Sequence, residues 1–416
     1  MSARLPGQGA LSSQIRHFHQ RLVLQRLRRV GEASRADLAR AAGLTNTAMG
    51  DIIKQLEEQG LVRSVGKRHE GQRGQPATML SLDPDGAYAL GVRLDRSRVE
   101  TVLIDMGGRV LGHRRHDGLL PSPQRARDIV LADIAMLVAL VPAERRARLT
   151  GVGVARPDNL GSWHTALDLS HGALAAWDGV AFGPGLAAAC GLAVFEENDG
   201  TAAAMAELFH GQGRALDDFL YVFIGPAIGG GVVLGGQCVR GQAGHAGDVG
   251  LLPAAPSTLA SAPPGPARDI LLSRASLNAL MRHLRFHGID VGTLGDIQAV
   301  GSQADAAIGE WIDDSAQALL DPVLSARALL DLPLVVIDSD LDPAWIDRLI
   351  ARTEAGLAAA LPEARTPPTL LRGSFGAMAG ALGAATLPLF LYFGPPAARL
   401  LPHAPPQPGG DHALAA

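Results

Sequence analysis

Lysine, cysteine and aromatic residues are all scarce in this chain of 416 residues. The only two lysines, Lys54 and Lys67, stand near the N-terminus, so no chemistry in the large C-terminal part can use a lysine side chain. The two cysteines, Cys190 and Cys238, are far apart, which excludes a disulfide framework and a Cys-x-x-Cys metal site. Both stand in apolar runs, so we expect them to be small buried residues.

Long apolar runs are also missing. No uninterrupted run reaches the ~20 residues that a transmembrane helix needs, and the N-terminus has no apolar segment typical of a signal peptide. We therefore expect a cytoplasmic protein with no membrane partner. The hydrophobic content of 47% can fill large cores, and the length predicts two or three domains. Residues 396–416 are rich in proline and glycine, and we expect them to be disordered.

Residues 43–62 have the pattern of a short turn, a thirteen-residue amphipathic helix and an immediate stop. Thr45 can cap the start of this helix, and Gly60 can supply the left-handed residue that ends it. Four apolar residues recur at helical spacing, namely Met49, Ile52, Ile53 and Leu56. The pattern predicts the recognition helix of a helix-turn-helix. Its outward face carries short side chains at the start, where a helix in a DNA major groove comes closest to the bases.

The flanking segments complete a winged helix-turn-helix over residues 1–82. Residues 14–29 form an amphipathic pattern, and a capping box at residues 34–37 starts a second helix that ends at Gly43. Two predicted strands, 61–65 and 76–82, enclose a basic loop and form the wing. The residues that we expect to contact DNA are Ser34, Arg35, Thr45, Asn46, Thr47, Gly50, Lys54, Lys67, Arg68 and Arg73.

Charge is distributed unevenly along the chain. Residues 1–82 hold 13 of the 37 basic and 6 of the 41 acidic residues, a net charge of +7. The rest of the chain holds 24 basic and 35 acidic residues, a net charge of −11. This asymmetry predicts a phosphate-binding surface at the N-terminus and argues against nucleic-acid contacts elsewhere. The alternative is a basic three-helix module with another partner.

From residue 87 onward the pattern changes to an α/β domain. Three successive strands suggest a meander, followed by a helix at 124–141, strands at 149–155 and 192–196, and a helix that opens at Asn198. The same scheme starts again with a strand at 219–224. Such a duplicated unit predicts two lobes with a cleft between them.

Six landmarks in order resemble the ROK family, which joins bacterial sugar kinases of the actin-like ATPase fold to repressors with an N-terminal winged helix. They are the winged helix, the strand and turn at 151–157, Trp177 with the Glu-Asn-Asp at 197–199, the glycine-rich stretch 224–236, GQAGHAGDVG at 241–250, and the small-residue helix at 373–385. The resemblance implies a two-lobed sugar-kinase-like (RNase H-like) sensor and oligomerisation domain over residues 83–395. It also implies a homodimer or homotetramer.

The chain departs from the family's kinases at all three nucleotide elements. The Asp-x-Gly-Gly-Thr loop that binds phosphate in the kinases is replaced by residues 93–97, with Asp95 and Arg96 at its centre. The second loop contains Pro226, which removes an N–H donor, and the third contains Asp338, whose charge would repel phosphate. The family's zinc motif is missing too, since residues 253–268 contain no cysteine and Leu251 stands at the histidine position. We expect no cofactor, no metal and no enzymatic activity.

The sugar-binding positions are better preserved. Asn198 and Asp199 match the pair whose aspartate acts as the base in the kinases, while Asp248 and Asp269 stand where the family carries glutamates that bind sugar hydroxyls. These four residues are the expected ligand site, made more apolar by Leu174 and Leu251. Alternatively, Asn198 and Asp199 only cap the helix that follows them. A lone His245 suggests no metal.

The sequence therefore predicts a transcriptional repressor that binds a double-stranded DNA operator and responds to a sugar or sugar-like effector. One alternative is an active ROK sugar kinase that has gained a DNA-binding arm. Another is a constitutive DNA-binding protein with a vestigial sensor.

Overall fold

The computed structural model describes residues 8–68, 76–158, 160–161, 170, 172–263, 269–360 and 366–394. Its N-terminal module contains three helices and a small sheet of order β1-β3-β2. In chain order the elements are α1 (Gln8–Val30), β1 (Glu32–Ser34), α2 (Arg35–Ala42), α3 (Asn46–Glu58), β2 (Val62–Arg68) and β3 (Ala77–Leu82). This order is that of a winged helix-turn-helix.

Local capping explains why α2 and α3 begin and end where the sequence predicts. Ser34 and Asp37 form a complete capping box at the start of α2, and Gly43 ends it in the left-handed conformation. Thr45 Oγ1 accepts a hydrogen bond from the Ala48 N–H, 3.3 Å away, at the start of α3. Gly60, with a φ of 69°, closes the end of α3. The predicted strand 61–65 is too short, because β2 remains paired with β3 as far as position 68.

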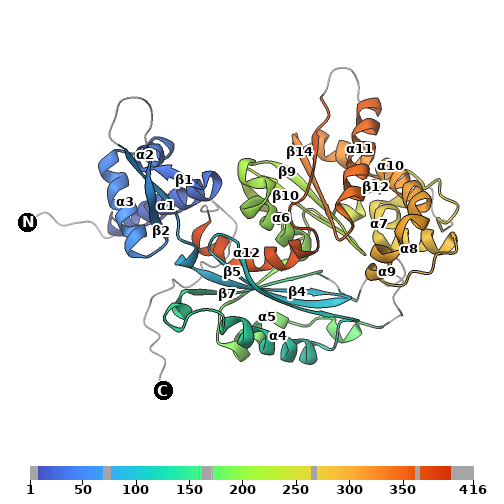
Figure 1. The fold of residues 1–416 in the computed structure, drawn as a ribbon, viewed down its shortest axis with the longest axis horizontal. Coiled ribbons are helices and arrows are strands. Elements are labelled where there is room, and N and C mark those ends of the chain that lie inside the picture. Colours follow the sequence, from blue (N-terminus) through green and yellow to red (C-terminus); the bar gives the residue numbers. More distant parts are fainter. Residues whose placement is uncertain are drawn as a thin grey trace, which may run out of the picture.

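The N-terminal lobe is a five-stranded sheet of order β6-β5-β4-β7-β8. Its strands are β4 (Tyr88–Asp95), β5 (Arg98–Asp105), β6 (Val110–Asp117), β7 (Leu149–Arg156) and β8 (Val194–Asn198). Helices α4 (Pro123–Val138) and α5 (Phe182–Cys190) cover one face, and α12 (Ala379–Phe393) lies against the other (Figure 1). The turn at 105–108 joins β5 to β6, as the sequence predicts.

The C-terminal lobe repeats this arrangement in a sheet of order β11-β10-β9-β14-β15. Its strands are β9 (Phe219–Ile224), β10 (Ile228–Leu234), β11 (Gln237–Val239), β14 (Leu334–Ser339) and β15 (Thr369–Arg372). The helices of this lobe are α7 (Leu271–Ala275), α8 (Leu277–Phe286), α9 (Leu294–Ala299), α10 (Asp305–Leu330) and α11 (Pro343–Ala360). The short strands β12 (Pro253–Ala254) and β13 (Asp269–Ile270) pair with each other. In both lobes an antiparallel meander continues into two parallel strands, which confirms the predicted duplication.

Helices α6 (Asp199–His210) and α12 pack closely against each other between the two sheets. A Cβ on Gly383 would lie 1.9 Å from the Ala202 carbonyl oxygen, and one on Gly153 would lie 1.8 Å from that of Ala384. Only glycine permits these approaches, which accounts for the small-residue sequence of α12. The segment Gly376–Phe393 is long and apolar enough to cross a membrane, but 61% of it is buried inside the protein. We therefore assign it to the core of the fold.

The winged helix shares a hydrophobic core with the two lobes. Leu27 and Leu56 of the module belong to the same buried cluster as Ile104 of β5 and Leu389 of α12. The module accordingly sits against the C-terminal end of α12, on the left of Figure 1. It is fixed to the lobes by packing as well as by the chain.

Candidate functional site

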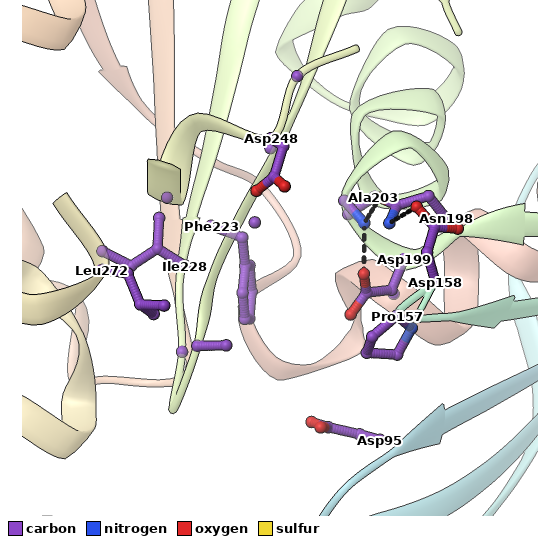
Figure 2. Close-up of a pocket in the computed structure, with 18 of the residues that line it drawn as sticks. Asp95, Pro157, Asp158, Asn198, Asp199, Ala203, Phe223, Ile228, Asp248 and Leu272 are labelled. Atoms are coloured by element: carbon purple, nitrogen blue, oxygen red, sulfur yellow. Dashed lines mark hydrogen bonds between the residues drawn. The ribbon is translucent and has the colours of Figure 1, made fainter. Parts of the chain in front are cut away.

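A cavity of about 420 Å³ lies between the two lobes. Figure 2 shows an apolar wall, formed by Phe223, Ile228 and Leu272, that faces a polar wall formed by Asn198 and Asp199. Mixed apolar and polar walls of this kind suit a ligand with an apolar face and several hydroxyl groups.

Asn198 and Asp199 are placed by the junction of β8 and α6. Asn198 is the N-cap of α6, and its Oδ1 accepts hydrogen bonds from the N–H groups of Gly200 and Thr201 at 2.9 and 3.3 Å. Asp199 also accepts from the Gly200 N–H, at 3.0 Å, while its carboxylate points into the cavity (Figure 2). Asn198 thus has the capping role that the sequence left open, and both residues also line the cavity.

Arg93 fills the region where the resemblance places a glycine-rich phosphate loop. Its guanidinium is 4% exposed, lies 3.2 Å from Asp95 Oδ2, and donates to the Ala377 carbonyl at 3.3 Å. Glu100 Oε2 lies 3.7 Å away. Burial disfavours the charged form, but the carboxylates of Asp95, Asp340 and Glu100 outweigh burial and raise the pKa of Arg93. The segment therefore contains buried ion pairs where a phosphate loop would present bare backbone N–H groups.

The other two nucleotide elements differ in their relation to the cavity. Pro226 lines it, as the sequence predicts. Asp338 does not line it, which corrects the expectation that its carboxylate would face a phosphate. Asp338 is buried and accepts hydrogen bonds from Tyr221 Oη at 3.2 Å, the Ser339 N–H at 2.9 Å and the Gly376 N–H at 3.0 Å. These bonds fix the turn after β14.

A polar bridge crosses the mouth of the cavity. Asp158, after the end of β7, accepts a 3.4 Å hydrogen bond from Asn198 Nδ2 and lies 3.5 Å from Nε2 of His245 on the opposite lobe. Sequence reasoning missed Asp158, although it follows the carboxyl end of a parallel strand, where ligands commonly bind in α/β proteins. His245 has no metal partner set within the described residues.

Two carboxylates of the cavity have perturbed acidity. Desolvation is the main cause that raises the pKa of Asp199, and the charge of Asp95 adds to it, while Arg93 opposes it. Desolvation likewise raises the pKa of Asp248, which also lines the cavity. In both carboxylates, burial disfavours the charged form.

Two predicted pocket residues lie elsewhere. Asp269 does not line the cavity, because its carboxylate accepts hydrogen bonds from the Ser257 N–H at 3.1 Å and from Ser273 Oγ at 3.5 Å beside the β12–β13 pair. Leu174 is buried in the core of the N-terminal lobe. Leu251 does line the cavity and is 43% exposed.

Most of the predicted DNA-contacting residues are exposed on the winged helix. The exposed ones are Arg35, Thr45, Asn46, Thr47, Lys54, Lys67 and Arg68. Gly50 is half-buried. Ser34 is a correction, since it is 1% exposed and its hydroxyl is engaged with Asp37 in the capping box. Arg73 lies outside the described residues. Lys67 and Arg68 stand on β2 rather than in a loop, and Arg68 lies 3.2 Å from Glu32.

The chain belongs to the ROK family, whose model matches residues 89–389. It is 29% identical to protein y4fQ of Sinorhizobium fredii, and the match covers 86% of this chain and 88% of that protein. It is 22% identical over 57% of its length to the xylose repressor of Bacillus spizizenii, and the match spans 60% of that protein.

Solved structures extend the similarity to the whole fold. A ROK family transcriptional regulator, described as a homologue of the Escherichia coli Mlc protein, matches 92% of this chain and 98% of its own with a TM-score of 0.65 at 22% identity. A ROK family glucokinase from Streptomyces griseus, solved with glucose and AMPPNP, matches 72% of this chain and 99% of its own with a TM-score of 0.56 at 20% identity. The fold is therefore a winged helix on a two-lobed, actin-like ATPase scaffold.

Proposed function

We propose that this protein is a cytoplasmic transcriptional repressor. It binds a double-stranded operator through α3 and the β2–β3 wing, and it responds to a sugar or sugar derivative that binds between its lobes. The observation that carries the proposal is a winged helix with an exposed recognition surface on a ROK scaffold, packed against the helix that also borders the ligand cavity.

The surface of α3 supports the DNA-binding part. Its apolar face is buried within the module, while Asn46, Thr47 and Lys54 remain exposed on the other face. A recognition helix reads base edges with residues of its N-terminal half, and cations near it contact phosphates. A homodimer or homotetramer would place two such helices in successive major grooves of a palindromic site.

The cavity supports the effector part. Asp199, Asp248 and Asn198 offer acceptor oxygens and an amide, and Phe223 offers an apolar face opposite Asn198 and Asp199. Ionised carboxylates accept hydrogen bonds from neighbouring hydroxyls, as sugar recognition requires. The name of the xylose repressor, which is similar to this chain, fits an effector of this class.

A second candidate function is sugar phosphorylation. Asp199 is the observation that favours it, because this carboxylate has a raised pKa and points into the cavity. Two features argue against a bound nucleoside triphosphate. The paired side chains of Arg93 and Asp95 occupy the region of the phosphate loop, and Pro226 lacks a backbone N–H donor. We therefore expect no catalysis.

One set of measurements with the purified full chain separates these functions. Operator fragments selected from random DNA should be bound specifically, and a panel of sugars should include one that changes this binding. A coupled assay of ADP release with the same panel should stay at background. Sugar-dependent ADP release that Asp199→Asn abolishes would establish the kinase instead. Specific DNA binding that no sugar alters would leave a constitutive regulator.

A further inference from the structure

Two histidines and a glutamate form a compact cluster on the C-terminal lobe. His283 stands in the last turn of α8, His287 is the residue that caps the end of this helix, and Glu310 stands on the neighbouring helix α10. Their candidate ligand atoms all lie within 4.8 Å of one another. Figure 1 shows α8 and α10 at the opposite end of the molecule from the winged helix. The cluster is thus separate from both surfaces described above.

The two distances from the histidines to the glutamate match those of a metal site. Nε2 of His283 and Nε2 of His287 lie 3.2 and 3.3 Å from Glu310 Oε2. In a tetrahedral zinc site with bonds of 2.0–2.1 Å, neighbouring ligand atoms lie roughly 3.3 Å apart. Two histidines four residues apart on one helix, completed by a carboxylate, are a recurrent zinc ligand set.

A further residue orients the buried histidine. Ser261 Oγ lies 2.8 Å from Nδ1 of His283, and the Ser261 carbonyl accepts a 3.2 Å hydrogen bond from Arg282. A proton on Nδ1 that is donated to this hydroxyl leaves the Nε2 lone pair directed at the cluster, which is the usual arrangement around a ligating histidine. His283 is 2% exposed, and its Nε2 has no hydrogen bond of acceptable geometry among the described residues.

We propose that His283, His287 and Glu310 bind a divalent transition-metal ion of the zinc type. Water supplies the fourth ligand on the side where His287 and Glu310 are exposed to solvent. The ion joins the C-terminal end of α8 to α10 and, through His283, also fixes Ser261, so its role is structural. None of the three ligands lies in the stretch 253–268, where the family's cysteine motif would stand.

The test uses the full chain, freed of metal with a chelator and titrated with Co²⁺. We expect one tightly bound Co²⁺ per chain, with visible absorption of a low-symmetry nitrogen and oxygen site, and stoichiometric displacement by Zn²⁺. Binding should weaken as the pH falls from about 7.5 to about 5.5, because ligating histidines must be deprotonated.

Variants identify the ligands. His287→Ala and Glu310→Gln should each abolish the Co²⁺ absorption without unfolding the protein, since both side chains are partly exposed. Ser261→Ala should keep the stoichiometry and weaken binding about 10–100-fold, as expected of a residue that only positions a ligand. The matched control is His116→Ala, because His116 is as exposed as His287 (37 and 36%) and also faces a carboxylate.

Two results would overturn the proposal. One is the absence of saturable Co²⁺ binding in the wild-type chain. The other is unchanged binding in both His287→Ala and Glu310→Gln, which would assign the ion to other histidines and leave the cluster as a set of hydrogen-bonded side chains.

Discussion

Replacing Arg28 by methionine should stabilise the protein. Arg28, in the last turn of α1, is 7% exposed, and its guanidinium carbon lies 4.2 Å from the centroid of the Phe209 ring. None of its side-chain nitrogens has a hydrogen-bond partner among the described residues. Burial, with a smaller contribution from the charge of Arg214, lowers the pKa of Arg28 from 12.5 to about 9. The interior of the junction therefore holds a cation without a counter-ion.

The size of the effect follows from these values. A pKa drop from 12.5 to about 9 corresponds to about 5 kcal/mol against the charged form. The cation–π contact with the Phe209 ring stabilises the charged form by about 2 kcal/mol. Methionine keeps the length of the side chain and removes the charge, so Arg28→Met should increase the free energy of unfolding by ~1–3 kcal/mol at pH 7.

The pH dependence provides a second signature. A base whose pKa is lowered in the folded state destabilises the fold below that pKa, and the penalty is relieved as the pH rises through about 9 towards 12.5. The stability difference between the Arg28→Met variant and the wild type should therefore be constant near neutral pH. It should narrow once the pH exceeds about 9.

Urea unfolding monitored by circular dichroism at several pH values measures both effects. Arg29→Met is the control, because Arg29 forms a partly exposed ion pair with Asp217 that is worth only about 0–1 kcal/mol. That control should be neutral or slightly destabilised. A loss of stability on Arg28→Met that matches or exceeds the loss in the control would refute the reasoning, since it would mean that the cation is well solvated or paired.

Three further outcomes are expected. Asn46→Ala with Thr47→Ala should reduce specific but not non-specific DNA affinity in gel shifts, because base contacts specify the site; equal losses on both DNAs would contradict this. Lys67→Ala with Arg68→Ala should weaken both specific and non-specific DNA binding and flatten the salt dependence of the affinity. Lys67 should give the larger effect, because Arg68 also pairs with Glu32. A sugar at a hundredfold excess over its Kd should stabilise the fold by ~2.7 kcal/mol, which is measured as a thermal shift. Asp248→Ala should abolish this shift, while operator binding of the free protein persists; a shift as large as that of the wild type would remove Asp248 from the site.

Features set by short-range chemistry were predictable from the sequence. The ends of α2 and α3 depend on Ser34, Thr45 and two glycines, each of which acts on backbone groups within one helical turn. The repeated meander was predictable because strand periodicity is local. The length of β2 was not, since it depends on pairing with β3 across a segment that the local pattern reads as loop.

The cavity was predictable only in part, because side-chain direction is a tertiary property. Asn198 and Asp199 both line the cavity, because a strand end and a helix start fix them together. Asp269 occupies the expected place in the order of landmarks, but Ser257 and Ser273 hold its carboxylate away from the cavity. Asp158 came into the site through contacts with residues 40 and more positions away, which no local pattern could have indicated.

Helix α12 connects the ligand cavity with the winged helix, because it contacts one at each of its ends. At the N-terminal end of α12, Gly380 borders the cavity. At its C-terminal end, Arg21 of α1 donates hydrogen bonds to the carbonyls of Leu391 and Tyr392, at 2.7 and 3.1 Å. Helix α12 is packed tightly against α6 and the N-terminal sheet. A ligand that shifts the lobes relative to α12 would therefore also shift the winged helix, which α12 contacts.

Such coupling needs two arrangements of similar free energy, which the ligand distinguishes by affinity. The side-chain nitrogens of Arg28 have no hydrogen-bond partner among the described residues, so this buried cation would narrow the free-energy gap between such arrangements if the module is docked on the lobes in one and displaced in the other. On this argument the more stable Arg28→Met protein should respond less to its effector. The variant docks its module more firmly, and the binding free energy of the ligand must then overcome this additional stability.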